Sequence, residues 1–276
     1  MPVRIGVADC PTAARPLRQF PIPVATIGGL PIAVIGRAAA AEHMVDVALA
    51  RRDREASPLV FTSANGQVLS LCAREPCVRD LFLSTDLIHA DGMPLVFVSR
   101  LFHASPLPER VATTDLFHDV APLAQRRGVR MFFLGAATAV MDKAVSRVRG
   151  MYPELQIVGH AGGYMRRAGD EDRIIDAIND ARPDILWLGL GVPTEQYFAM
   201  RNRARLHGVG IIKTSGGLFD FLSGRNSRAP HWMQRAGLEW AYRIYLEPRR
   251  LAGRYLLTNP HAAFLLLTRT RSAQTR

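Results

Sequence analysis

Residues 185–217 read ILWLGLGVPTEQYFAMRNRARLHGVGIIKTSGG, and they say more about the architecture than any other stretch of the chain. The apolar run 185–188 indicates a buried strand, the periodic segment 194–206 a helix, and 209–212 a second buried strand. Both strands lead into glycines and small polar residues, which mark turns. Because strand, helix and strand in this order form a βαβ unit, the stretch predicts a parallel sheet.

The same alternation extends toward the N-terminus. We expect further strands at 59–62, 86–90, 130–134 and 155–158, and helices at 37–52, 67–74, 91–101, 114–127, 138–149 and 170–181. A short hairpin around the Gly28-Gly29 pair is expected at 24–35. The predicted fold class is α/β, with a mostly parallel sheet, helices on both faces and a helical appendage at the C-terminus.

Charge is distributed unevenly along the 276 residues. Hydrophobic residues make up 48% and charged residues 21%, as in a folded globular protein. The net charge is +11, yet residues 225–276 alone hold ten arginines against two acids, so this segment carries +8. We therefore expect a loose leader at 1–22, an α/β core at 23–224 and a basic appendage at 225–276, whose arginines require an anionic partner.

Three interpretations of the appendage stay open from composition alone. Short helices are expected at 230–237, 238–245, 249–257 and 261–268, with six aromatic residues interleaved among the arginines. They form either a helical cap with solvated arginines, or a segment that lies on a bilayer surface, or a nucleic-acid-binding region. No helix-turn-helix, RNP or zinc-finger pattern supports the third. The longest uncharged stretch, at 19–36, contains three prolines and a glycine pair, so it is not a spanning helix.

Several expected strands end in glycine or small polar residues, for example at 62–65, 90–92, 189–191 and 215–217. In an open parallel sheet these loops share the carboxyl edge, where ligands bind, and amides at the following helix starts suit phosphate. The chain has no GxxxxGK[ST] loop and no HExxH motif, and its three cysteines lack metal-ligand spacing. Gly189-Leu190-Gly191 matches only part of a dinucleotide fingerprint.

The most specific motifs lie near the C-terminus. In order they read GGLFD at 216–220, RAPHW at 228–232, GLEWAYR at 237–243, EPRR at 247–250 and RY at 254–255. This series closely resembles the ending of the WecG/TagA/CpsF family of bacterial glycosyltransferases, glycosyltransferase family 26. Ser63-Ala64-Asn65 fits the family's TxN loop, Ala90-Asp91-Gly92 its ADG loop, and residues 110–116 its RVxGxDL segment. The resemblance covers roughly residues 27–258.

The resemblance implies a Rossmann-like core with a helical C-terminal appendage that attaches to a membrane and completes the active site. It implies an inverting, metal-independent transfer of a hexose from a UDP-sugar to a polyprenyl-diphosphate-linked sugar, with no cofactor, in surface or exopolysaccharide biosynthesis. The hexose is left open between N-acetylmannosamine, its uronic acid and glucose. We expect a cytoplasmic protein, peripheral on the inner face of the cytoplasmic membrane, that self-associates and binds no nucleic acid. The alternative is a non-catalytic module that binds UDP-sugar or lipid.

The resemblance also implies roles for particular residues. Asp91 would be the general base, Arg110 an electrostatic partner for diphosphate or sugar, and Asp220 a contact for sugar or nucleotide. Each has a plainer alternative: Asp91 as a helix cap, Arg110 as a solvated arginine and Asp220 as a turn residue. The expected substrate-binding residues are Thr62, Ser63, Asn65, Gly92, Asp115, Gly135, Gly163, Tyr164, Gly191, Glu195, Gln196, Gly217, Arg228, Arg243, Arg249 and Arg250.

The chain departs from the family pattern at four places, of which Ser215, where an apolar residue is common, is a minor one. Ser63 stands where threonine is usual, and Thr113 stands where the RVxGxDL segment has glycine. The family's PxQE reads Pro-Thr-Glu-Gln here, so Glu195 and Gln196 exchange acid and amide. The amide expected to meet sugar or diphosphate is therefore displaced.

Overall fold

The structure is a computed structural model that describes residues 22–52, 54, 56–163 and 169–271. Its centre is a six-stranded sheet in which every pairing is parallel, with the order β4-β3-β8-β7-β5-β6. The strands are β3 (Leu59–Ala64), β4 (Leu87–Ala90), β5 (Arg130–Gly135), β6 (Gln156–Ala161), β7 (Ile185–Gly189) and β8 (Ile211–Thr214). The predicted α/β class is confirmed and is consistent with a Rossmann-like fold, although β8 begins two residues later than the sequence predicts.

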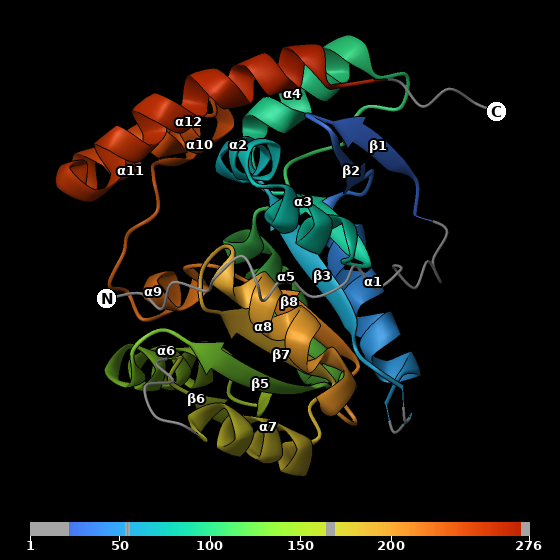
Figure 1. Cartoon of the computed structure of the whole chain (residues 1–276). Helices are drawn as coiled ribbons and strands as arrows, with labels where there is room; N and C mark the ends of the chain where they lie inside the picture. The colour runs from blue at the N-terminus through green and yellow to red at the C-terminus, as the bar shows by residue number, and fades with distance from the viewer. Residues whose placement is uncertain (1–21, 53, 55, 164–168, 272–276) are drawn as a thin grey trace.

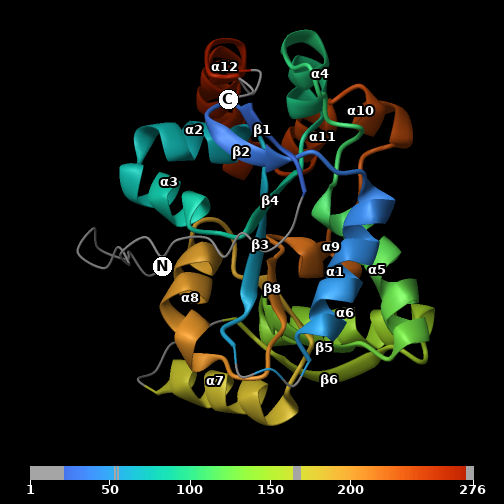
Figure 2. The same ribbon diagram turned by 90° about the vertical axis from the view of Figure 1, so that its right-hand side faces the viewer.

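Helices cover both faces of this sheet (Figures 1 and 2). One face carries α1 (Arg37–Ala50), α5 (Thr113–Arg127), α6 (Thr138–Met151) and α9 (Leu218–Leu222), and the other α7 (Asp170–Ala181) and α8 (Thr194–Asn202). Alternate residues of β7 supply the two cores: Trp187 packs with the first group of helices and Leu186 with the second. Burial on both faces explains why β7 is an unbroken apolar run rather than an alternating one.

A smaller layer lies beyond strand β4. It contains the hairpin β1 (Val24–Ile27) and β2 (Leu30–Ala33) with helices α2 (Gly66–Arg74), α3 (Pro76–Leu83) and α4 (Met93–Phe102). The predicted hairpin is confirmed, and its turn uses Gly28 and Gly29 at φ +59° and +88°, a conformation that other residues adopt only with strain. Helix α3 was not predicted, although Pro76 in its first turn is a favourable start.

The C-terminal segment forms α10 (His231–Arg235), α11 (Glu239–Leu246) and α12 (Pro248–Thr268). The two helices predicted at 249–257 and 261–268 are in fact one, with Pro260 inside it. A proline inside a helix removes one internal hydrogen bond and crowds the carbonyl one turn earlier, which costs about 3 kcal/mol. Burial of the inward side of α12 opposes that cost. The inward side of α12 is fully buried at Leu251 and Leu265.

Helix α12 is tied to the smaller layer at its end. The Gly29 amide donates to the carbonyl of Arg269 at 3.0 Å, and the Arg271 amide donates to the carbonyl of Thr26 at 3.1 Å. In Figure 1 the helix therefore runs across the top of the molecule beside α2 and α4. The boundary between core and appendage at residue 225 stays a prediction, and the leader at 1–22 lies almost wholly outside the described residues.

Candidate active site

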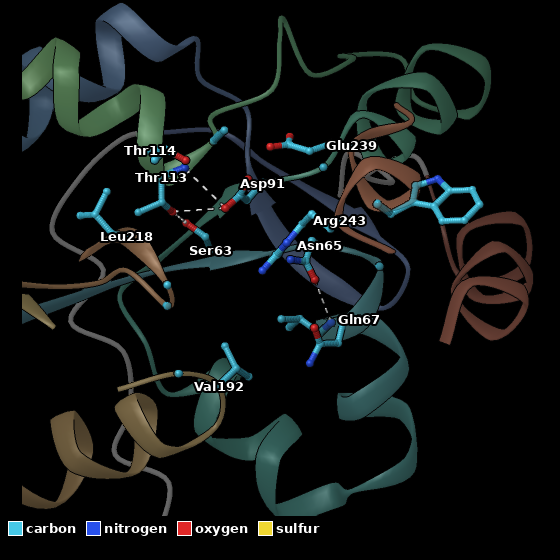
Figure 3. A pocket seen from close by; sticks show the side chains of 18 of the residues that line it. Ser63, Asn65, Gln67, Asp91, Thr113, Thr114, Val192, Leu218, Glu239 and Arg243 are labelled. Carbon is cyan, nitrogen blue, oxygen red and sulfur yellow. Dashed lines mark hydrogen bonds between the residues drawn. The ribbon is translucent and has the colours of Figure 1, made fainter. Parts of the chain in front are cut away.

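A cavity of about 800 Å³ opens at the carboxyl edge of the sheet. Loops that follow β3, β4, β7 and β8 form one side of it, and residues of α11 and α12 form another (Figure 3). Most of the residues that the sequence predicts for the site line this cavity: Ser63, Asn65, Asp91, Gly92, Arg110, Gly163, Gly191, Glu195, Gly217, Asp220, Arg228 and Arg243. Segments far apart in the chain thus meet where the parallel sheet predicts a ligand site.

Two predicted residues lie beneath the cavity rather than on its surface. Thr62 and Gln196 are both fully buried, and the Gln196 amide donates to the Thr62 hydroxyl at 3.0 Å. The Thr214 hydroxyl completes this group by donating to Thr62 at 2.8 Å. These contacts join β3, α8 and β8, so both side chains support the floor of the cavity.

Two other predicted residues, Gly135 and Arg249, are not part of the cavity lining. A Cβ at Gly135 would lie 2.2 Å from the carbonyl oxygen of Gly189, so glycine is needed there for close approach of two loops. Arg249 is exposed in the first turn of α12. Arg250 follows it in α12, where its side chain is not described, and Tyr164 lies outside the described residues.

Asp91 occupies the position directly after β4. Its Oδ2 atom accepts from the amide of Thr113 at 3.4 Å and from the hydroxyl of Thr113 at 3.3 Å. The helix-cap alternative does not describe it, because Gly92 is the capping residue of α4 and Asp91 meets the start of α5 instead. Burial raises the pKa of Asp91, and the positive charges of Arg110 and Lys213 only partly oppose that rise. A raised pKa makes a carboxylate a stronger proton acceptor than a solvated one.

Asn65 and Ser63 line the cavity beside this carboxylate. The Asn65 side chain caps α2, accepting from the Val68 amide at 3.2 Å, as residues at helix starts commonly do. The Ser63 hydroxyl lies 3.1 Å from that of Thr113 and accepts from Lys213 Nζ at 2.8 Å. Both residues therefore have structural partners in addition to a surface open to a ligand.

Two arginines and two carboxylates join the core to the C-terminal helices. Arg110 donates to Glu239 at 2.7 Å and to Asp115 at 3.2 Å, while Arg228 pairs with the same two acids at 3.1 and 3.0 Å. Asp115 was predicted to bind substrate, but it does not line the cavity and instead forms ion pairs within this cluster of Arg110, Asp115, Arg228 and Glu239. Burial disfavours the charge of Arg110, but Glu239 and Asp91 outweigh that effect and raise its pKa. The cluster fixes Arg110 in the cavity wall.

Glu195 holds two of the glycine loops together. Its Oε2 atom accepts from the amide of Gly216 at 2.9 Å and from that of Gly191 at 3.3 Å. The sequence analysis expects backbone amides of these loops to bind phosphate, but these two amides already donate to Glu195. Burial raises the pKa of Glu195 to about 7, and the backbone hydrogen bonds and Lys213 moderate the rise. The exchange of acid and amide thus places a titratable group on the cavity wall.

Two cationic residues of the site were missed by the sequence analysis. Arg254 of α12 lines the cavity, its Nε and Nη2 atoms are buried without a hydrogen-bond partner among the described residues, and its guanidinium lies 5.0 Å from the Tyr255 ring centre. Lys213 is buried at the cavity floor. The signals were present: Arg254 opens the RY motif, and Lys213 is a lone lysine within an apolar strand.

Residues 25–276 match the glycosyl transferase WecG/TagA/CpsF family. The chain belongs to this family. It is 33% identical over 190 residues to an N-acetylglucosaminyldiphosphoundecaprenol N-acetyl-beta-D-mannosaminyltransferase of Bacillus spizizenii, covering 69% of this chain and 72% of that one. It is 31% identical over 216 residues to a protein of the same name from Bacillus subtilis, covering 78% and 82% of the two chains.

The resemblance read from the motifs is thereby confirmed, and this WecG/TagA/CpsF protein is a glycosyltransferase. Glycosyl transfer needs a group that takes a proton from the attacking hydroxyl and charges that stabilise the departing group. The cavity contains a carboxylate with a raised pKa, Asp91, and several guanidinium groups that include Arg243 and Arg254. Membership in a family of enzymes also argues against the non-catalytic binding module.

Proposed function

We propose that this glycosyltransferase moves N-acetylmannosamine, or a closely related hexose, from a UDP-sugar to a sugar carried on a polyprenyl diphosphate. The relatives support the acceptor class, because their names specify N-acetylglucosaminyldiphosphoundecaprenol as the molecule that receives N-acetylmannosamine. The observation that carries the proposal is the half-buried Asp91 carboxylate in a cavity lined by arginines. The product would enter assembly of a surface polysaccharide.

The proposed chemistry is a single displacement with inversion. An acceptor hydroxyl attacks the anomeric carbon of the donor while its proton passes to Asp91. The bond between that carbon and the β-phosphate oxygen of UDP breaks, and its electron pair leaves with UDP. Burial favours the step because it raises the pKa of Asp91, which makes the carboxylate a stronger base for the proton of the acceptor hydroxyl.

The negative charge that develops on UDP needs stabilisation, and we assign it to arginine rather than to a metal. Arg254 is the best placed for this role, because its Nε and Nη2 atoms are buried and have no hydrogen-bond partner in the part of the chain that the structure describes. A buried guanidinium gains most from an anion that supplies the missing hydrogen bonds. Arg243 of α11 lines the same cavity and adds positive charge. Arg110 and Arg228, which are paired with acids, would serve more to shape the wall.

The acceptor's lipid implies contact with a membrane, and the surface of α12 supports it. Leu256, Leu257, Phe264 and Leu267 are all at least 60% exposed, and their spacing places them along one side of the helix. Leu101 of neighbouring α4 is 74% exposed. Among the described residues, no helix has the length and hydrophobicity needed to cross a bilayer. We propose peripheral attachment at the inner face of the cytoplasmic membrane, with these side chains in the interface.

The decisive experiment compares the wild-type enzyme with Asp91→Asn. UDP release is measured with a panel of UDP-sugars, with and without a short-chain polyprenyl-diphosphate N-acetylglucosamine, and in the presence of EDTA. We expect acceptor-dependent release from UDP-N-acetylmannosamine, and a loss on the order of 100-fold in the variant, which retains the side-chain shape but accepts no proton.

The matched control is Asp176→Asn, which removes an exposed carboxylate of α7 far from the cavity lining. It should release UDP at the wild-type rate. Failure of every donor despite UDP binding by calorimetry would contradict the proposed transfer. Loss of release in EDTA would contradict metal independence.

A further inference from the structure

Lys213 places a buried ammonium group inside the sheet, and its charge interacts with that of Asp91, the proposed catalytic carboxylate. It belongs to β8, which lies between β3 and β7, and it pairs in register with Phe61 and Trp187. Its side chain is 0% exposed. Burying a charge without compensation costs several kcal/mol, so the groups around it need to hold it. Lys213 takes part in neither the proposed proton transfer to Asp91 nor the stabilisation of departing UDP by arginines.

The hydrogen bonds of Lys213 lead to Asp91. Lys213 Nζ donates to the Ser63 hydroxyl at 2.8 Å, and the Ser63 and Thr113 hydroxyls are 3.1 Å apart. The Thr113 hydroxyl then donates to Asp91 Oδ2 at 3.3 Å, and Figure 3 shows this last part of the chain. An ammonium group has no acceptor and an ionised carboxylate has no donor. With these two ends, each hydroxyl accepts from the Lys213 side and donates toward Asp91.

We propose that Lys213 is a positioning residue for sugar transfer: through Ser63 and Thr113 it orients a chain of donors onto Asp91 Oδ2, which keeps Asp91 ionised and leaves its other oxygen for the acceptor hydroxyl. The proposal rests on the proposed function of Asp91 as the base. It also gives a role to one departure from the family pattern, since Thr113 supplies a hydroxyl where the RVxGxDL segment has glycine.

The charges that face Lys213 come from three elements. Asp91 follows β4 and Glu195 lies on α8, and the negative charges of both stabilise the ammonium group. His89 of β4 also interacts with Lys213, whose positive charge disfavours protonation of the imidazole. Burial, followed by the charge of Lys213, holds the pKa of His89 well below its usual range, so this imidazole is neutral. Burial lowers the pKa of Lys213 itself to about 8, against the pull of Asp91 and Glu195. Lys213 is therefore protonated at neutral pH.

The test is the pH profile of kcat/KM for acceptor-dependent UDP release from UDP-N-acetylmannosamine. Lys213→Met fills the same space without the charge, and we expect the acid limb to move upward by on the order of one pH unit. Lys143→Met is the matched control, because Lys143 is the other lysine of the chain and is exposed on α6. It should reproduce the wild-type profile. A lower rate for Lys213→Met with an unmoved acid limb would mean a merely structural role and would overturn the proposal.

A second measurement needs no substrate. Carbon-13 labelling of aspartate carboxyls follows the titration of Asp91 by NMR, with Asp91→Asn assigning its signal. The Asp91 pKa should be higher in Lys213→Met than in the wild type, and an equal pKa would overturn the inference. If no donor supports transfer by the wild type, the proposed function fails while this titration still decides the role of Lys213. Lys213→Gln, which restores a donor without charge, replaces the methionine variant if that protein does not fold.

Discussion

At the scale of single residues, the exchange at Glu195 and Gln196 has a structural explanation. Glu195 faces the cavity and accepts the amides of Gly191 and Gly216, while Gln196 points into the interior toward Thr62. An amide can donate to a buried hydroxyl, whereas a carboxylate at position 196 would bring a charge into the core. The exchange therefore moves the charge from the interior to the cavity wall, where two backbone donors stabilise it.

Glu195→Gln is predicted to change how stability depends on pH. The Glu195 pKa is about 7 when folded and about 4.5 when unfolded, so the folded wild type binds more protons between these values and loses stability as pH rises. The loss over the whole interval is on the order of 3 kcal/mol, at about 1.36 kcal/mol per pH unit. Glutamine does not titrate. We expect the melting temperature of the variant, relative to wild type, to be several degrees higher at pH 7.5 than at pH 5.

Exposed Glu154 provides the control for this measurement. Glu154→Gln should keep a constant difference in melting temperature from wild type across the same pH range. The assignment to Glu195 is wrong if the difference for Glu195→Gln also stays constant.

At the scale of the element, α12 shows why its sequence was hard to interpret. Pro260 and the preceding asparagine favour a break, and the sequence analysis therefore predicts two helices. The chain stays helical because Leu265 and Leu266 pack on the smaller layer. That packing depends on tertiary contacts, which local propensity does not contain. It also decides which arginines of α12 turn toward the cavity.

Arg254 and Arg249 lie on the same helix and allow a direct comparison. Arg254→Gln removes from the cavity a guanidinium whose Nε and Nη2 atoms have no hydrogen-bond partner among the described residues. Affinity for UDP should therefore fall about tenfold by calorimetry, the usual value of a charge-assisted hydrogen bond. Uridine binding should change little, because uridine lacks the diphosphate. Arg249→Gln alters an exposed side chain outside the cavity and should leave UDP affinity within about twofold. Equal losses for UDP and uridine in Arg254→Gln would point to distortion of the cavity instead.

At the scale of the whole molecule, the sequence predicts the individual strands and helices better than it predicts which of them lie side by side. Alternating strands and helices predict a parallel sheet, and the motifs predict most of the residues that line the cavity. Strand order does not follow from the alternation, and β8, the last strand in the chain, lies next to β3 in the interior of the sheet. That position brings Lys213 of β8 to Ser63 of β3, 150 residues earlier. The lone lysine in an apolar strand was a visible signal, but no local pattern shows that it contacts Ser63, so its part in the site could not be predicted.

The exposed apolar side chains of α12 lead to the last prediction, which is that the protein attaches to a membrane. Burying Leu256, Leu257 and Phe264 in a bilayer interface is worth about 1–2 kcal/mol per side chain, to which arginines add attraction for anionic lipid. A variant in which Leu256, Leu257 and Phe264 are all replaced by serine should bind phosphatidylglycerol vesicles on the order of 100-fold more weakly, as measured by sedimentation. These three residues lie on the exposed side of α12, so UDP release with a short-chain acceptor should stay near the wild-type rate.

Met151 and Val158 are exposed apolar residues of α6 and β6, and their double serine variant is the control that should sediment like wild type. Binding to duplex DNA at matched salt distinguishes a general response to positive charge, since DNA binding would not depend on the three apolar side chains. If the triple variant sediments as well as wild type, the membrane surface lies elsewhere. If sedimentation and soluble-acceptor activity fall together, the three side chains support the fold of α12 rather than a bilayer contact.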